Sequence, residues 1–202
     1  MNPPAETKIK ARAFHYSESE LKQATALLRN SICRIQAIGL NRFTTAVKNL
    51  HEKFPSSTII YVRNLSGAMK IHLRSNNLPV VGVDPEKFEG YRYKCVSEPE
   101  FHTVADAMKK YTGDVIFVFD WVNTYCGSYD KEAVDEVDKS SSHKIVGIVE
   151  LMYPGISGSD ELYDYMQNLK NNDDWDFACE EVDTLLVGEG SFPIILNVAR
   201  RN

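Results

Sequence analysis

Two kinds of hydrophobic pattern alternate along most of the chain. Short apolar runs rich in β-branched residues predict strands, and segments whose apolar residues recur every three or four positions predict helices. The predicted strands cover residues 57–62, 79–83, 91–96, 114–122 and 144–153. The predicted helices between them cover residues 66–75, 100–111, 130–140 and 159–170. Because such alternation builds a mostly parallel sheet with helices on both faces, the sequence predicts a doubly wound, Rossmann-like α/β fold.

Two further amphipathic segments, residues 17–36 and 42–54, precede the first predicted strand. Their apolar residues fall at helical spacing, which predicts two helices ahead of the sheet. We expect Gly39 to end the first helix and Asn41 to cap the second. Two helices exceed what the sheet needs, so they are candidates for a cover, a substrate lid or a docking element.

The end of the chain departs from the alternation. Residues 182–201 contain two apolar runs joined across "GEGSFP", which leaves no room for a helix. This pattern predicts a β-hairpin, so the sheet is expected to end in antiparallel strands. The acidic stretch before it, "NNDDWDFACEEVD" at residues 171–183, is expected to be a solvated loop and helix.

Composition narrows the class of protein. A chain of 202 residues builds one substantial core, and we expect a division into residues 1–54, an extension with a helical lead, and residues 55–202, the α/β domain. The net charge of −5 argues against a general polyanion binder. The four cysteines show no metal-binding spacing, and no apolar run is long enough to span a membrane. We therefore expect reduced thiols, no metal and a cytoplasmic location.

The second strand ends in "PVVGVDPE", which places Asp84 about twenty residues after the end of the first strand. In doubly wound folds an acidic side chain there accepts hydrogen bonds from the two ribose hydroxyls of a nucleoside. The alternative is that Asp84 and Pro85 start a turn, and the spacing alone leaves the two interpretations about even. After the first strand only Gly67 is present where a dinucleotide fold needs several glycines, so NAD or ATP binding is weakly supported.

At the level of architecture, residues 40–202 resemble the class I S-adenosylmethionine-dependent methyltransferases. The resemblance rests on the order of elements, on "VGVDPE" and on the closing hairpin. It implies that Asp84 binds the cofactor's ribose. The implied contacts to the cofactor's amino-acid part come from Arg63, Asn64, Ser66 and Gly67. The acceptor would meet Asp120, Trp121 and Asn123, although Trp121 packing a loop and Asp120 capping a turn would explain these residues equally.

A narrower similarity is to the capping methyltransferase-guanylyltransferases of alphavirus-like RNA viruses. It rests on "NRFTTAVKNLHEKFPSSTIIYV", "DPEK", "DVIFVFDWVNTYCGSYD" and "HKIVGIVELMY". It implies an RNA substrate and S-adenosylmethionine as cofactor. A lysine–aspartate–lysine–glutamate set of the ribose methyltransferases would use an upstream lysine together with Asp120, Lys144 and Glu150. Lys144, however, lies at the start of its strand, away from the expected ligand edge.

The sequence also departs from both families. Tyr61, Arg63 and Asn64 stand where the methyltransferases have an acidic residue and a glycine-containing loop, and Arg63 would lie close to a cationic sulfonium. Residues 34–43 hold no histidine for guanylate attachment, and Lys87 stands where an arginine is expected. These departures support a second hypothesis: a catalytically inactive scaffold that binds RNA or a protein partner.

Overall fold

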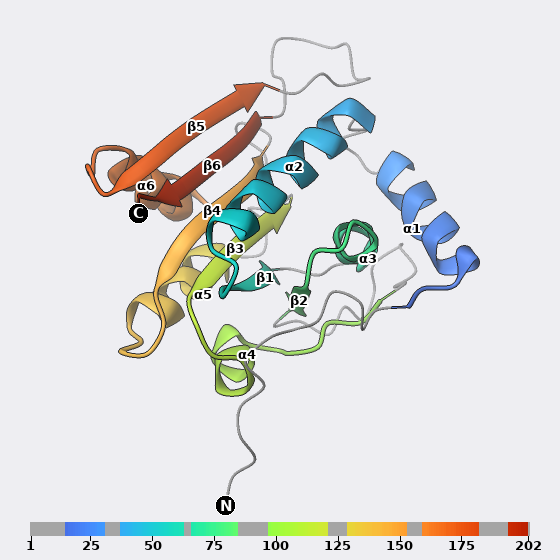
Figure 1. The fold of residues 1–202 in the computed structure, drawn as a ribbon, viewed down its shortest axis with the longest axis horizontal. Coiled ribbons are helices and arrows are strands. Elements are labelled where there is room, and N and C mark those ends of the chain that lie inside the picture. The colour runs from blue at the N-terminus through green and yellow to red at the C-terminus, as the bar shows by residue number, and fades with distance from the viewer. Residues whose placement is uncertain are drawn as a thin grey trace, which may run out of the picture.

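The computed structural model describes residues 15–30, 37–62, 66–84, 97–120, 129–152, 159–181 and 194–201. Its helices are α1 (Glu18–Asn30), α2 (Ala37–Lys53), α3 (Ala68–Ser75), α4 (Val104–Lys110), α5 (Tyr129–Asp138) and α6 (Asp160–Lys170). Its strands are β1 (Thr58–Val62), β2 (Val80–Val83), β3 (Val115–Asp120), β4 (Ile145–Met152), β5 (Trp175–Glu181) and β6 (Ile194–Arg200). Strands and helices alternate from β1 to α6, as the hydrophobic pattern predicts (Figure 1).

The described strands form one six-stranded sheet in the order β2-β1-β3-β4-β6-β5. Strands β1 to β4 pair in parallel, and β6 runs antiparallel to both of its neighbours, β4 and β5. The predicted α/β fold with a closing antiparallel hairpin is therefore confirmed. The first strand of the hairpin is β5, however, which lies ahead of the predicted run at residues 182–187; those residues lie outside the described part of the chain.

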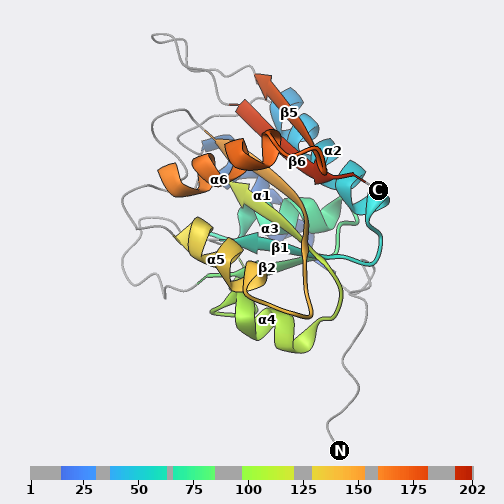
Figure 2. The same ribbon diagram turned by 90° about the vertical axis from the view of Figure 1, so that its left-hand side faces the viewer.

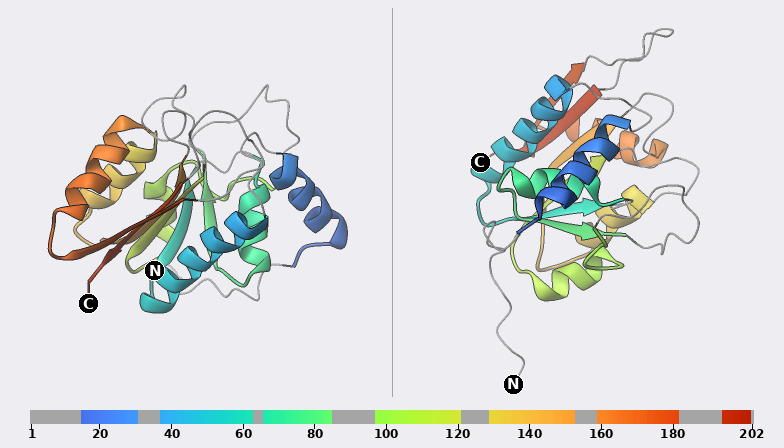
Figure 3. Two further views of the ribbon diagram at one scale, coloured as in Figure 1. Left: turned by 90° about the horizontal axis from the view of Figure 1, so that it is seen from above. Right: turned by 90° about the vertical axis from the view of Figure 1, so that its right-hand side faces the viewer.

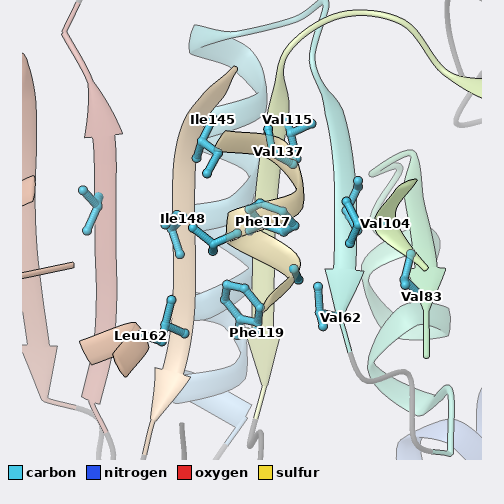
Figure 4. Close-up of a cluster of buried hydrophobic side chains, with 14 of the residues drawn as sticks. Val62, Val83, Val104, Val115, Phe117, Phe119, Val137, Ile145, Ile148 and Leu162 are labelled. Atoms are coloured by element: carbon cyan, nitrogen blue, oxygen red, sulfur yellow. The ribbon is translucent and has the colours of Figure 1, made fainter. Parts of the chain in front are cut away.

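Helices cover both faces of the sheet (Figures 2 and 3). On one face, α4, α5 and α6 pack against a core that includes Phe117, Phe119 and Ile148, which Figure 4 shows pointing to the same side. On the other face, Phe43, Val47 and Leu50 of α2 join Met69 and Leu73 of α3 over the alternate strand residues. Residues of the parallel strands are buried on both sides, which explains why β3, "VIFVFD", carries no polar residue before Asp120.

Three sequence predictions differ from the structure. Helix α2 begins at Ala37 and runs through Gly39 and Asn41, so neither of these residues marks a helix boundary. A single glycine costs a helix only about 1 kcal/mol, and burial of the apolar face of α2 outweighs that cost. The acidic stretch expected to be a loop and helix contains β5 instead. The helix predicted from residue 100 begins only at Val104, as α4. Phe101 instead forms a parallel bridge with Val83 of β2. The strand predicted at 91–96 lies outside the described residues.

Helix α1 packs mainly on α3. Ala24 of α1 is buried against Ala68 and Ile71 of α3, and Leu21, Leu27 and Leu28 surround this contact. Among the described helices none is long and apolar enough to cross a membrane.

Candidate functional site

The strand order places a topological switch point between β1 and β3. The chain passes from β1 through α3 to β2 on one side, and then returns to β3 on the other side of β1. In open α/β sheets ligands bind beyond the carboxyl ends of the strands at such a point. A ligand site is therefore expected at the carboxyl ends of β1, β2 and β3. The titratable side chains at or just after these ends are Tyr61, Asp84 and Asp120, respectively.

Tyr61 and Asp120 lie on the same face of the sheet and touch. Tyr61 is paired in register with Val118, and Asp120 is the next residue of β3 on that face, one step nearer the carboxyl edge. The phenol oxygen of Tyr61 donates a hydrogen bond of 3.4 Å to Oδ2 of Asp120. Tyr61 is only 2% exposed, whereas Asp120 is partly exposed. The buried tyrosine therefore holds a carboxylate that solvent still reaches.

Asp84 is the third member of this group. Its side chain is 2% exposed, so it turns into the protein and not outward. Burial raises the pKa of Tyr61 well above its ordinary value, and the charges of Asp120 and Asp84 raise it further. Burial also raises the pKa of Asp120 to about 6, against a smaller lowering by the hydrogen bond from Tyr61. The carboxylates of Asp84 and Asp120 thus act on one phenol from two different strands.

The backbone of Asp84 is fixed by the segment just before α4. The amide of Asp84 donates to the carbonyl of Phe101 at 3.1 Å, and His102 Nδ1 lies 3.4 Å from the carbonyl oxygen of Asp84. The amides of Glu100 and Phe101 both donate to the carbonyl of Gly82. This segment follows the outer edge of β2 and holds Asp84 in position from outside the sheet.

Glu100 anchors the same segment through an ionic network that no sequence pattern predicts. Its Oε1 lies 2.9 Å from Lys70 Nζ and 3.0 Å from an Arg74 nitrogen, and its Oε2 accepts from the amide of Gly82 at 2.7 Å. Lys70 is fully buried and Arg74 nearly so, and Arg74 also donates twice to the carbonyl of Val80. The network ties α3 to β2. Its partners are about thirty residues apart in sequence, so no local pattern signals it.

The loop before α3 brings together two of the predicted cofactor contacts. The hydroxyl of Ser66 accepts from the amide of Ala68 at 3.3 Å, at the start of α3. Gly67 has a φ of 75°, and a Cβ on it would lie 2.1 Å from the carbonyl oxygen of Ser97. The close approach at Gly67 is thus made by the protein's own backbone. Arg63, Asn64, Trp121 and Asn123 lie outside the described residues, so their predicted roles stay predictions.

A second polar group lies on the opposite face, between the starts of α5 and α6. Asp130 is fully buried and accepts hydrogen bonds from the amide and the hydroxyl of Ser159, both at 2.7 Å. Glu150 of β4 is 2% exposed, and its Oε2 has no hydrogen-bond partner in the part of the chain that the structure describes. Burial, and next the charge of Asp130, raise the pKa of Glu150 to about 8. Glu150 is therefore largely protonated at neutral pH.

Metal-binding geometry is missing from the described residues, which contain no group of three or more histidine, cysteine, aspartate or glutamate side chains placed to hold an ion. Cys179, the cysteine that the structure describes, is exposed on β5 and unpaired. Among the described residues, the titratable side chains after or near the ends of β1, β2 and β3 are Tyr61, Asp84 and Asp120.

No protein-family model and no curated protein matches the sequence. Among solved structures, the chain is similar to the magnesium protoporphyrin IX methyltransferase of Synechocystis PCC 6803 with bound S-adenosylmethionine, at 13% identity and a TM-score of 0.44, covering 93% of this chain and 100% of that one. It is also similar to the O-methyltransferase from Bacillus cereus in complex with S-adenosylhomocysteine, at 11% identity and a TM-score of 0.49, covering 94% of each chain. The assignment of the fold to the doubly wound α/β class rests on the strand order and the two helical layers.

Proposed function

We propose that the protein binds S-adenosylmethionine at the carboxyl ends of β1, β2 and β3 and transfers its methyl group to an acceptor beside Asp120. The observation that carries the proposal is the buried carboxylate of Asp84, directly after β2 and at the switch point of the sheet. A carboxylate in that place accepts two vicinal hydroxyl hydrogens of a ribose, and both bonds are charge-assisted.

The residues at the switch point fit the nucleoside part of the cofactor best. Asp84 is held from two sides, by its place after β2 and by the backbone carbonyl of Phe101 together with the imidazole of His102. Gly67, in the loop before α3, contributes less to cofactor binding, because Ser97 fills the space beside it. When bound, the cofactor supplies an electrophilic methyl group on a sulfonium. The protein's part is to orient the ribose through Asp84 and the acceptor through Asp120, because an in-line displacement gains mostly from proximity and orientation.

The narrower proposal for the acceptor is RNA. It is supported by the resemblance of four stretches, including "DVIFVFDWVNTYCGSYD" and "HKIVGIVELMY", to viral capping domains, and the net charge of −5 requires any RNA contact to be local. The alternative, an inactive scaffold that keeps the architecture without the cofactor, is supported by Tyr61 in place of the acidic residue expected in β1. Cofactor binding decides between the two.

Isothermal titration with S-adenosylmethionine and S-adenosylhomocysteine tests the proposal. We expect micromolar binding to the unaltered protein and a loss of about ten- to a hundredfold in Asp84→Asn, since a hydrogen bond to a charged group contributes about 1.5–3 kcal/mol. Asp106→Asn, which changes a half-exposed aspartate of α4 that pairs with Lys109, is the matched control and should bind normally. Comparing the affinities for adenosine and 2′-deoxyadenosine extends the test, because the two ligands differ only in the 2′-hydroxyl that Asp84 is proposed to bind.

The result that overturns the proposal is the absence of binding to the unaltered protein at millimolar ligand. Equal affinities of the unaltered protein and Asp84→Asn would leave cofactor binding intact but remove Asp84 from it. Far-ultraviolet circular dichroism of each variant shows whether a loss of binding reflects a loss of structure.

A further inference from the structure

The contact between Tyr61 and Asp120 carries an inference that deepens the proposed function and rests on it. We propose that Asp120 is the base that removes a proton from an uncharged O–H or N–H acceptor during methyl transfer, and that Tyr61 is a positioning residue that holds the carboxylate of Asp120 in place.

The geometry leaves one oxygen of Asp120 for a ligand. The phenol of Tyr61 donates to Oδ2 at 3.4 Å. Within the described residues Oδ1 has no hydrogen-bond partner, and Asp120 is partly exposed, whereas Asp84 and Glu150 are each 2% exposed. Of these three carboxylates at the carboxyl edge of the sheet, Asp120 is therefore the one that an acceptor reaches most easily.

Tyr61 is well suited to positioning. Its ring belongs to the buried cluster between the sheet and the helices α2 and α3, together with Ile59, Met69 and Val118. A ring packed in this way fixes the direction of its hydroxyl group. Because the pKa of Tyr61 is raised, the phenol keeps its proton and remains a hydrogen-bond donor to Asp120 throughout the neutral range.

Charge selects the class of acceptor. Asp120, with a pKa of about 6, is mostly ionised at neutral pH and is still a stronger base than an exposed aspartate. Asp84 adds a second carboxylate to the same face, so an anionic acceptor would be repelled. Among the described titratable groups, Tyr61 of β1 acts on Asp120 and the charge of Asp84 acts on Tyr61. On β4 the neighbour of Asp120 is the apolar Leu151.

The proposed step is balanced. As the acceptor oxygen or nitrogen forms its bond to the methyl carbon, the bond from that carbon to sulfur breaks and its electron pair stays on sulfur, which becomes a neutral thioether. The proton of the acceptor moves to Oδ1 of Asp120. No oxidant, reductant or metal is needed, and the proton then leaves Asp120 to water.

The test uses sinefungin, an analogue of the cofactor that carries a protonated amine in place of the sulfonium methyl group. If Asp120 faces the transferred methyl group, the ammonium of sinefungin meets an ionised carboxylate. We measure the dissociation constants of sinefungin and S-adenosylhomocysteine by titration calorimetry between pH 5 and pH 8. Taking their ratio cancels any titration that affects both ligands equally. At pH 8 we expect sinefungin to bind about tenfold or more tightly than S-adenosylhomocysteine. This preference should decline as the pH falls through about 6.

Two variants sharpen the test. Asp120→Asn should abolish the pH dependence of the ratio while S-adenosylhomocysteine still binds. Tyr61→Phe should keep the dependence but move its midpoint to higher pH, because the hydrogen bond from Tyr61 lowers the pKa of Asp120. A purely structural role for Tyr61 would not move that midpoint.

The outcomes separate the two proposals. If S-adenosylhomocysteine does not bind at all, the proposed function fails and this inference fails with it. If S-adenosylhomocysteine binds but the ratio is the same at every pH in the unaltered protein, Asp120 does not face the methyl group and only the inference fails. The pH dependence of the affinity ratio is measured on the unaltered protein, so this test stands even if Asp120→Asn or Tyr61→Phe does not fold.

Discussion

Glu150 provides a sharp test of the electrostatics of this fold. Its carboxyl group is buried and feels the charge of Asp130, and its Oε2 has no partner among the described residues. The folded protein therefore binds a proton at Glu150 that the unfolded chain releases at a much lower pH. Glu150→Gln replaces this group with a neutral one of nearly the same shape. We expect this variant to be more stable than the unaltered protein at neutral and alkaline pH.

The magnitude follows from the two pKa values of Glu150. Because the folded pKa is raised to about 8 from an ordinary 4.5, the free energy of unfolding falls as the pH rises between these values. At about 1.4 kcal/mol for each pH unit, the cost at pH 7 is roughly 3 kcal/mol. It reaches about 5 kcal/mol above pH 8 and vanishes below pH 4.5. Glu150→Gln lacks this cost at every pH.

Urea denaturation at pH 5, 7 and 8.5 measures the effect. The stability of Glu150→Gln relative to the unaltered protein should increase with each step in pH, by about 3 kcal/mol or more in total. Glu161→Gln, an exposed position in the first turn of α6, is the matched control and should show no such trend. A stability difference that is constant from pH 5 to pH 8.5 would mean that Glu150 is not protonated in the folded protein, and would refute the reasoning.

Two further predictions concern a pair of glycines and the ionic network of Glu100. Gly67→Ala should destabilise the protein by about 3 kcal/mol, because φ is 75° and the new Cβ would overlap the backbone of Ser97. Gly147→Ala should cost only about 1 kcal/mol, because the new Cβ meets the movable side chain of Leu50; urea denaturation of both variants tests this difference, and equal losses would contradict it. Glu100→Gln should cost about 3 kcal/mol in the same assay, since it removes the negative charge that the buried Lys70 and Arg74 share, and a cost under 1 kcal/mol would show that the ionic network is dispensable.

The parallel part of the sheet follows from sequence because its strands are buried on both faces. Strands β1, β2, β3 and β4 are near-continuous apolar runs, and such runs bounded by polar turns leave few alternatives. The carboxyl ends of these strands were equally accessible to prediction. Asp84 and Asp120 stand out because each is the first acidic residue after an apolar run.

Strand β5 escaped prediction because it is an edge strand whose residues are mostly exposed. Trp175 is its buried residue, and the rest of "WDFACEE" has the composition of a solvated segment. Its acidic residues are matched by cations from elsewhere in the chain: Asp176 pairs with Lys53 and Arg201, and Glu180 pairs with Arg42. These partners come from α2 and from the residue after β6, so a local pattern contains no record of them.

The same limit applies to the site. Sequence position predicts that Asp84 and Asp120 reach one edge of the sheet, but it does not predict that Tyr61 lies between their charges. That contact depends on the register of β1 against β3, which sets Tyr61 beside Val118 and one step below Asp120. Register is a property of the packed sheet, so the role of Tyr61 emerges only from the structure.

Register also separates the acidic groups at the carboxyl edge. Asp120 is paired with Leu151, so Glu150, one residue earlier on β4, points to the opposite face, where Asp130 lies. A ligand that touches Asp120 therefore lies on the side of the sheet that α2 and α3 cover. Glu150 lies on the other side, which α5 and α6 cover. It follows that Glu150→Gln should change the pH dependence of stability while leaving the affinity for S-adenosylhomocysteine, and its ratio to that of sinefungin, unchanged. A shift in that ratio in Glu150→Gln would show that the two faces share one ligand, and the assignment of the base to Asp120 alone would then be wrong.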